Sequence, residues 1–413
     1  MARLRVRLAL VITAVMCVPA TAVGADAGSG SKLKPDQRDG IVIAHRGASG
    51  SRPEHTLDAY RLAIKQCADY IEPDVVSTRD HVLVARHEND ISGTTDVADH
   101  PEFADRQTTK VIDGTAIAGW FTEDFALTEL KTLRAKERMP DVRPENAAYD
   151  GKFEVPTLQE VLDLARRSRT CKGKRVGVYP ETKHPSYFDS IGLSLEEPLV
   201  RQLHDSGYRG KRAAAYIQSF EVGNLQELRS MTRVRLMQLV NCGAADLVTP
   251  AGFDFASTYA AGIAVCKDLV IPRDGAGNLA IPTSVVADAH ARGLKVHAWT
   301  FRAENQFLPT NLRSSADPNA PGDLAGEIRA FLDAKIDGYF TDNPDIGRRA
   351  SRSTYRSLMA SVLILGGGLG GLAATHELRT PVGDGHDITV IDRNDRFYMG
   401  FAKLWPMADR GAL

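Results

Sequence analysis

Short apolar runs alternate with amphipathic segments along most of this chain, from about residue 41 to about residue 350. Such runs are typical of buried strands, and the segments between them have the apolar spacing of helices. Strands are expected at Ile41–Ala44, Tyr70–Val76, Arg175–Tyr179, Ala214–Ser219, Arg235–Val240, Leu269–Pro272, Lys295–Thr300 and Gly338–Thr341. Helices are expected at Leu57–Cys67, Leu158–Arg166, Glu197–Leu203, Thr283–Arg292 and Leu324–Ala334.

This alternation predicts the α/β class and, within it, a TIM (β/α)8 barrel over residues 41–350. About eight strand–helix units in roughly 300 residues match a barrel better than a doubly wound sheet. A polar stretch at about residues 89–154 is too long for a simple loop. We expect it to be an insertion after the second strand. Whether it shapes the mouth of the substrate site or has no role there is equally open.

The N-terminus has the three-part pattern of a secretory signal peptide. Three arginines precede the apolar run Leu8–Val18, and the small residues Val23-Gly24-Ala25 follow it. We expect a signal peptide at residues 1–25, with Ala20-Thr21-Ala22 as a competing cleavage site, and a flexible leader at residues 26–40. The apolar run is short for a membrane span. The pattern predicts an exported protein, periplasmic or secreted, with no stable membrane anchor after cleavage.

Bulk charge points to no polyanionic partner, since the formal net charge is −1 and 25% of the residues are charged. We therefore expect no nucleic-acid partner. The composition does not determine the oligomeric state. Beyond the signal segment lie four widely spaced cysteines: Cys67, Cys171, Cys242 and Cys266. Disulfides and buried free thiols are both open, and four cysteines allow three pairings.

Polar side chains that carry chemistry stand where the first two strands are expected to end. His45 and Arg46 follow the first strand, Glu72 and Asp74 end the second, and His87 follows about a dozen residues later. Barrel enzymes carry their active sites at the carboxyl ends of the strands. A lone histidine is more often a structural residue than a functional one. Several charges at the ends of apolar runs, however, destabilise the fold unless they are paired or bind an ion.

The third strand adds a carboxylate and a cation, Glu181 and Lys183. Together with Glu72 and Asp74, the new carboxylate would give three hard oxygen ligands, which favour Mg²⁺ or Ca²⁺ over zinc. The neighbouring arginine and lysine would face a phosphate bound to the same ion. Two histidines that move protons complete a set suited to phosphodiester hydrolysis.

The sequence resembles the glycerophosphodiester phosphodiesterases, especially the periplasmic bacterial type. The likeness begins with Ile43–Gly50 and Pro53–Leu57 and covers about residues 41–346. Further matches follow in strand order: Glu72-x-Asp74, His87, Glu181-x-Lys183, Gln218-Ser219-Phe220, Trp299-Thr300 and Thr341-Asp342-Asn343-Pro344.

The resemblance implies a TIM barrel that hydrolyses deacylated phospholipids, such as glycerophosphocholine, to sn-glycerol 3-phosphate and an alcohol. It also implies roles for the matched residues. These are His45 and His87 as general acid and base, Glu72, Asp74 and Glu181 as metal ligands, and Arg46, Lys183, Gln218 and Trp299 as substrate-binding or phosphate-binding residues. Ca²⁺ is expected over Mg²⁺, because the periplasmic relatives lean that way.

Two positions depart from the family pattern. Glu88 follows His87 where the family commonly has Asp, which puts a supporting role for this carboxylate in doubt. Arg302 stands where many relatives carry Asn, and capping of the mouth is favoured over contact with the substrate. Glu54 and Gln218 are each open between a place in the site and one in the scaffold, and a Trp such as Trp299 is more often core.

The last fifty or so residues have the fingerprint of a dinucleotide-binding βαβ unit. The strand Val362–Leu365 precedes a glycine-rich turn, and the strand Ile388–Ile391 ends in an acid; the fingerprint residues are Gly366, Gly368, Gly371 and Asp392. The segment resembles the start of an FAD- or NAD-dependent oxidoreductase. One βαβ unit cannot close such a site, so residues 361–413 are expected to be a truncated Rossmann-like fragment.

Three other functions compete with the main one. A phospholipase D-like barrel would cleave an intact lipid with similar histidines and a similar ion. An oxidoreductase would bind FAD or NAD through the C-terminal fragment. A barrel that binds without catalysis would require the whole series of motif residues to have survived without use.

Overall fold

A curled sheet of parallel strands, whose pairings close it into a ring, lies at the centre of the protein. The computed structural model describes residues 40–356, 362–365 and 388–391. The strands of the ring are β1 (Ile41–Ala44), β2 (Tyr70–Ile71), β3 (Asp74–Ser77), β7 (Gly177–Val178), β8 (Glu181–Thr182), β9 (Tyr216–Ser219), β10 (Arg235–Val240), β11 (Gly262–Cys266), β12 (Lys295–Phe301) and β13 (Gly338–Thr341).

The ring closes because each strand position pairs with two neighbours. Pro73 divides the second position into β2 and β3, and Pro180 divides the third into β7 and β8, since proline has no N–H to donate to the ladder. β2 pairs with β1 and β7, and β3 pairs with β8, which also pairs with β9. Parallel pairing then continues through β10, β11, β12 and β13 and returns to β1. The fold is TIM-barrel-like.

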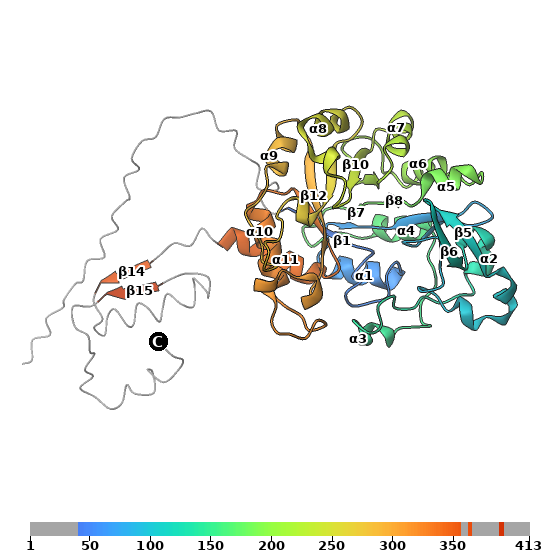
Figure 1. Ribbon diagram of the computed structural model, residues 1–413, viewed down its shortest axis with the longest axis horizontal. Helices are drawn as coiled ribbons and strands as arrows, with labels where there is room; N and C mark the ends of the chain where they lie inside the picture. The colour runs from blue at the N-terminus through green and yellow to red at the C-terminus, as the bar shows by residue number, and fades with distance from the viewer. Residues whose placement is uncertain (1–39, 357–361, 366–387, 392–413) are drawn as a thin grey trace, which may run out of the picture.

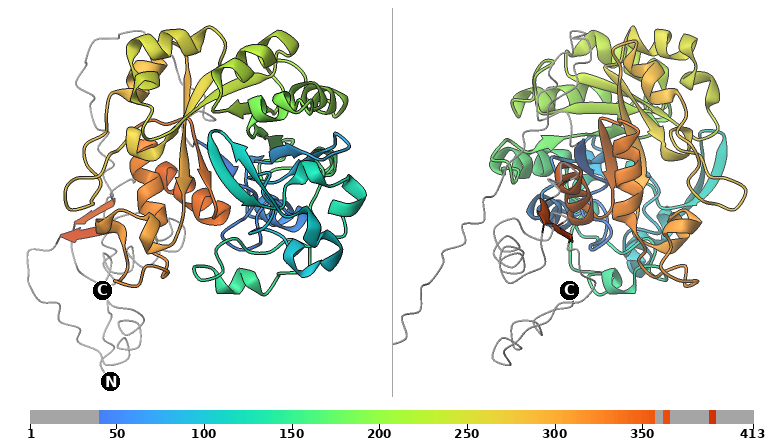
Figure 2. Two further views of the ribbon diagram at one scale, coloured as in Figure 1. Left: turned by 45° about the vertical axis from the view of Figure 1, so that its right-hand side comes forward. Right: turned by 90° about the vertical axis from the view of Figure 1, so that its left-hand side faces the viewer.

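Helices cover the outside of the strands (Figures 1 and 2). Those that follow or precede ring strands are α1 (Leu57–Lys65), α4 (Leu158–Arg167), α5 (Pro185–Ser190), α6 (Glu196–Asp205), α7 (Val222–Met231), α8 (Pro250–Ser257), α9 (Val285–His290), α10 (Leu324–Asp333) and α11 (Pro344–Arg356). α4 begins with a capping box in which Thr157 and Glu160 bond each other's backbone N–H. Among the described helices, none is long and apolar enough to cross a membrane.

The inside of the ring is filled by side chains. Tyr179 stacks on Tyr216 with ring centroids 4.8 Å apart, and Phe340 meets Tyr179 edge-on at 5.0 Å. The Tyr179 hydroxyl also lies 2.9 Å from His297 Nδ1. The ring is therefore a packed core rather than a pore, as in other barrels of this kind, and a substrate has access only at its ends.

One expected strand is wrong. The sixth ring strand is β11 at Gly262–Cys266, and the expected run Leu269–Pro272 lies after it, beyond a 3₁₀ turn at Lys267–Leu269. The small residues around Gly262 weaken the apolar signal, although close packing requires one of them, because a Cβ there would collide with the Lys295 carbonyl. The next run is more apolar, but its proline disfavours a central strand.

Residues 89–154 lie between β4 (Leu83–Ala85), which pairs antiparallel with β3, and α4. They contain the hairpin β5 (Thr108–Ile112) and β6 (Thr115–Gly119) and the short helices α2 (Leu127–Leu130) and α3 (Pro144–Ala147). Figure 1 shows the hairpin beside α5, where His184 Nδ1 lies 2.7 Å from Asp113 Oδ2. The assignment of this segment as an insertion stays a prediction.

The four cysteines within the described residues all form disulfides. Cys67 pairs with Cys171, and Cys242 pairs with Cys266. The first bond joins the turn after α1 to the segment after α4. The second joins the ends of the neighbouring strands β10 and β11. The structure thus decides for disulfides over buried free thiols and selects one of the three pairings.

Both terminal predictions lie largely outside the described residues. The expected signal peptide and almost all of the leader precede residue 40, where the description begins. At the other end, β14 (Val362–Leu365) and β15 (Ile388–Ile391) pair in parallel. The fingerprint residues Gly366, Gly368, Gly371 and Asp392 lie outside the described ranges, so the Rossmann-like fragment stays a prediction.

The two disulfides predict unequal losses of stability. Cys67 and Cys171 are 104 residues apart, whereas Cys242 and Cys266 are 24 apart. A cross-link that closes a longer loop removes more entropy from the unfolded chain. Replacing Cys67 and Cys171 by serine should lower the free energy of unfolding by about 2–4 kcal/mol, about 1 kcal/mol more than the same change at Cys242 and Cys266. Guanidinium unfolding of both double variants measures this, and equal midpoints for the variants and the parent would contradict it.

Candidate active site

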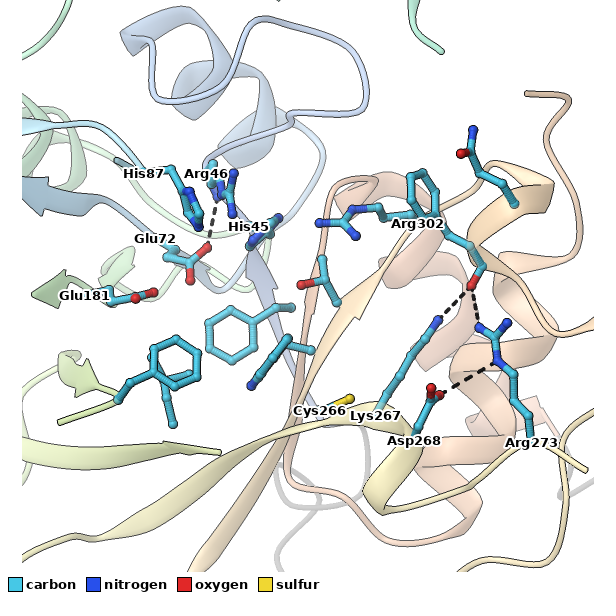
Figure 3. A pocket seen from close by; sticks show the side chains of 17 residues that line it. His45, Arg46, Glu72, His87, Glu181, Cys266, Lys267, Asp268, Arg273 and Arg302 are labelled. Carbon is cyan, nitrogen blue, oxygen red and sulfur yellow. Dashed lines mark hydrogen bonds and ion pairs between the residues drawn. The ribbon is translucent and has the colours of Figure 1, made fainter. Parts of the chain in front are cut away.

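A cavity of about 390 Å³ opens at the carboxyl ends of the ring strands, where the sequence places its candidate residues. Figure 3 shows His45, Arg46, Glu72, His87 and Glu181 at one end of this cavity. His45, Arg46 and Glu72 follow the parallel strands β1 and β2, and Glu181 begins β8. His87 follows β4, which runs antiparallel to β3 and ends beside Asp74, where Arg86 N–H donates to the Asp74 carbonyl at 3.0 Å. The carboxyl ends of parallel strands lie on one face of a barrel.

Three buried carboxylates converge beneath the cavity. Glu72, Asp74 and Glu181 each offer an oxygen, and these oxygens lie within 4.8 Å of one another. Their side chains are almost completely buried, and Asp74 and Glu181 are direct partners in the β3–β8 register. Asp74 Oδ1 is buried without a hydrogen-bond partner. A buried orphan oxygen beside two further carboxylates suits a hard divalent cation, which is how the three residues fit the expected metal site.

Burial and mutual repulsion govern the charge of this cluster. Burial, with Asp74 adding to it, raises the pKa of Glu181 to about 7 against the opposing effect of Lys183. Burial and the same aspartate raise the pKa of Glu72 well above its usual range. The pKa of Asp74 is lowered despite burial, because His55 and Arg46 stabilise its charge. Without a cation, the cluster therefore retains protons near neutral pH.

Two cations hold the carboxylates from the side. The Arg46 backbone N–H donates to Glu72 Oε2 at 3.0 Å, and its guanidinium donates to Glu54 at 3.1 Å. Arg46 Nε also lies 3.6 Å from Asp74 Oδ2. Lys183 Nζ donates to Glu181 Oε1 at 3.0 Å. Both expected phosphate-binding cations are therefore at the site, with Glu54 as a scaffold partner of Arg46.

His45 is held by a carboxylate from the opposite end of the barrel sequence. Its Nδ1 lies 2.6 Å from Asp342 Oδ1, at the end of β13, which pairs with β1. Asp342 Oδ2 accepts from Arg143 at 2.6 Å and from Arg302 at 3.0 Å. Burial, aided by Arg46, lowers the pKa of His45 to about 4. The imidazole is thus neutral at pH 7, with Nδ1 positioned to donate to Asp342 and Nε2 left as a base.

His87 has the same kind of support from its own neighbour. Its Nδ1 lies 2.7 Å from Glu88 Oε1, and Glu88 Oε2 lies 2.7 Å from His184 Nε2. Burial, then Arg46 and Lys183, lower the pKa of His87 to about 3. The longer carboxylate that departs from the family pattern therefore does contact this imidazole.

The two remaining site candidates differ in position. Gln218 is completely buried and does not line the cavity; instead, its Nε2 donates to Glu72 Oε1 at 2.7 Å. It holds a carboxylate of the cluster rather than facing the substrate space. Trp299 lines the cavity, packs edge-on against Phe220 with ring centroids 5.9 Å apart and anchors its Nε1 on the Ala264 carbonyl at 2.9 Å.

The structure adds residues that sequence reasoning did not assign to the site. His55 is completely buried, and its Nε2 lies 3.1 Å from Asp74 Oδ2. Asp342 was quoted only as part of a motif, although its place at the end of the last strand was a usable signal. Arg143 comes from the segment at residues 89–154 and had no signal, because its partners Asp342 and Glu304 are 199 and 161 residues away.

Comparisons with known proteins agree with this geometry. The sequence model of the Glycerophosphoryl diester phosphodiesterase family matches residues 45–346. A glycerophosphodiester phosphodiesterase of Arabidopsis thaliana is 36% identical over 323 residues, which cover 73% of this chain and 82% of that protein. One from Bacillus subtilis is 27% identical over 351 residues, covering 84% and 96% of the two chains.

Solved structures share the fold. A glycerophosphoryl diester phosphodiesterase structure from Silicibacter pomeroyi matches with a TM-score of 0.56 at 20% identity, covering 76% of this chain and 94% of that one. An Oleispira antarctica phosphodiesterase, solved with the product sn-glycerol-3-phosphate, matches with a TM-score of 0.52 at 21% identity, covering 75% and 96%. The chain therefore belongs to the glycerophosphoryl diester phosphodiesterase family and is an enzyme that hydrolyses glycerophosphodiesters.

Proposed function

We propose that the enzyme acts outside the cytoplasm on deacylated phospholipids, such as glycerophosphocholine, and releases sn-glycerol 3-phosphate and an alcohol. We further propose that it uses a bound divalent cation, Ca²⁺ in preference to Mg²⁺, and that His45 and His87 transfer the protons. One observation carries the proposal: a buried cluster of three carboxylates and two carboxylate-supported histidines meet at one cavity.

In this proposal, Glu72, Asp74 and Glu181 hold the cation. When bound, the cation supplies a positive charge that offsets the charge growing on phosphate oxygens during the reaction. Arg46 and Lys183 lie against the same carboxylates and add fixed positive charge near the phosphate. The fixed positions of these groups favour the transition state, because they need little rearrangement when the charge develops.

The histidines complete the proton transfers. A glycerol hydroxyl attacks phosphorus and gives its proton to one imidazole, while the other imidazole, which must enter the step as the imidazolium that a bound phosphate anion favours, protonates the departing alcohol oxygen. Water then opens the cyclic phosphate that has formed, with the two imidazoles in exchanged roles, and gives sn-glycerol 3-phosphate. Asp342 stabilises the positive charge that forms on His45, and Glu88 does the same for His87. Because both rings have a carboxylate at Nδ1, the geometry permits either assignment of acid and base.

The location and the choice of ion rest on further observations. Two disulfides fit an oxidising compartment outside the cytoplasm, as does the signal-like N-terminus. The cluster offers three carboxylates, each able to bind a cation through one or both oxygens, which suits the larger and more variable coordination of Ca²⁺ better than the strict octahedron of Mg²⁺. Product formation is proposed by analogy with the Oleispira antarctica protein.

Removal of either imidazole should abolish most activity. His45→Ala and His87→Ala are each expected to lower kcat for glycerophosphocholine by roughly 10²-fold or more, because proton transfer contributes that much. A coupled assay of glycerol 3-phosphate release measures the loss. The matched control is His290→Ala, since His290 lies on α9 and pairs with Asp337 away from the cavity. Losses of less than about threefold in both site variants would contradict the assignment.

Chelation and ion replacement test the cation. EDTA should stop glycerol 3-phosphate release, and Ca²⁺ should restore it at lower concentration than Mg²⁺, since all three ligands are carboxylates. Glu72→Gln should need much more Ca²⁺ for half-maximal activity. Full activity after exhaustive chelation would rule out the proposed cation, and better restoration by Mg²⁺ would rule out the choice of Ca²⁺.

Cation affinity should rise with pH. Because the pKa of Glu181 without cation is about 7, Ca²⁺ must displace a proton from it at pH 6 but from few molecules at pH 8. The dissociation constant should fall by about tenfold per pH unit for each displaced proton. Calorimetry at pH 6, 7 and 8, in buffers of different ionisation enthalpy, measures both affinity and proton release. Glu181→Gln should bind more weakly with a shallower pH dependence, and equal affinities of the parent at the three pH values would contradict this account.

A further inference from the structure

The cavity has a second end whose charges the proposed mechanism does not use. Its lining there includes Lys267, Asp268, Arg273, Arg302 and Phe307. Figure 3 shows the four charged residues of this set across the cavity from Glu72 and Glu181, with the Arg302 guanidinium directed toward the space between the two ends. Lys267 and Arg302 each pair with a carboxylate, Glu327 and Asp342, and Arg273 lies near Asp268, so this end attracts an anion through unused hydrogen-bond donors rather than through a net positive charge.

Arg302 is fixed in place while its terminal nitrogens stay free. Its Nε donates to Asp342 Oδ2 at 3.0 Å, and its guanidinium carbon lies 4.9 Å from the centroid of the Phe307 ring. Within the part of the chain that the structure describes, neither terminal nitrogen donates a hydrogen bond to protein. The side chain is 21% exposed, as expected for one that borders a cavity. A rigid guanidinium with two unused N–H₂ groups matches the two oxygens of a carboxylate or phosphate.

The ring beneath Arg302 is itself held by the other two cations. Lys267 Nζ donates to the Phe307 carbonyl at 3.1 Å, and an Arg273 terminal nitrogen donates to it at 2.8 Å. The charge of Lys267 is offset by Glu327 at 2.6 Å. Arg273 Nε lies 3.8 Å from Asp268 Oδ1. Lys267 and Arg273 therefore hold the Phe307 backbone and, through it, the ring beneath Arg302.

The carboxylate end already supplies what the reacting phosphate needs, namely the cation site, Arg46 and Lys183. His45 and Arg302 bond the two different oxygens of Asp342, and Figure 3 shows His45 between Glu72 and the Arg302 guanidinium. A substituent of the phosphate that extends past His45 would reach Arg302. A quaternary ammonium group there would meet the Arg302 guanidinium and has no N–H or oxygen to bond it, whereas an anion would gain a charge-assisted pair of hydrogen bonds.

We propose that the Arg302 end of the cavity is a subsite for a negatively charged group on the alcohol half of the substrate. The enzyme then prefers glycerophosphodiesters whose alcohol bears a carboxylate or a second phosphate over those with a cationic alcohol such as choline. This inference rests on the proposed function and specifies its substrate class.

The test compares kcat/KM for four substrates that share the glycerophosphate half. Glycerophosphoserine carries a carboxylate, glycerophosphoglycerol 3-phosphate carries a second phosphate, glycerophosphoglycerol is neutral and glycerophosphocholine is cationic. Each is assayed with the parent enzyme, Arg302→Gln, Arg302→Lys and the control Arg167→Gln, an arginine on the outer surface of α4 with a 75% exposed side chain.

The parent should favour at least one anionic substrate over glycerophosphocholine by about tenfold or more. Arg302→Gln should lower that ratio by about 10- to 100-fold, mainly through KM, because two charged hydrogen bonds are lost. Arg302→Lys should restore part of it, and Arg167→Gln should match the parent. The ranking of the two anionic substrates identifies the preferred anion.

Two results would overturn the subsite. One is a parent that prefers glycerophosphocholine. The other is an equal loss on all four substrates in Arg302→Gln, which would mean that Arg302 acts on the reacting phosphate or through Asp342. Failure of the proposed function would give a different result: the parent would release no glycerol 3-phosphate from any of the four substrates.

Discussion

This active site depends on one constraint: the barrel holds three carboxylates close together and shields them from water. Glu72, Asp74 and Glu181 repel one another, and burial removes the solvent that would relieve the repulsion. Such a cluster is stable only if it keeps protons, pairs with cations or binds an ion. The neighbouring cations and hydrogen-bond donors offset part of the negative charge. Asp74 Oδ1 still has no hydrogen-bond partner, and a divalent cation would supply one.

The fold produces this constraint by simple means. Proline interrupts the second and third strand positions, and the residues after each break, Asp74 and Glu181, are direct partners across the sheet. Closure of the ring brings β13 beside β1, so that Asp342 supports His45 although they are 297 residues apart in sequence. Arg143 then links Asp342 to the segment at residues 89–154, which makes that segment part of the support of a proposed catalytic group.

Much of the fold and of the site could be predicted from the sequence, because the barrel strands are short apolar runs and charged residues follow them directly. His45, Arg46, Glu72, Asp74, His87, Glu181 and Lys183 all lie at one site as expected, and the strand order was right except for β11, whose small residues give a weak apolar signal. The sequence leaves Gln218 open between the site and the scaffold, because a sequence pattern does not tell which polar group lines a cavity, and in the structure it supports Glu72. The contacts of His55, Arg143 and Arg302 depend on tertiary packing and on pairs far apart in sequence, which periodicity does not encode.

The occupancy of the carboxylate cluster tests this account most directly. Crystals of the enzyme soaked in Mn²⁺, a divalent ion with strong anomalous scattering that stands in for the native cation, would be examined in an anomalous difference map. The account predicts a peak about 2.0–2.6 Å from an oxygen of each of Glu72, Asp74 and Glu181. A map with no peak at these residues, or with its peaks only at other carboxylates, would contradict the central role of the buried cluster.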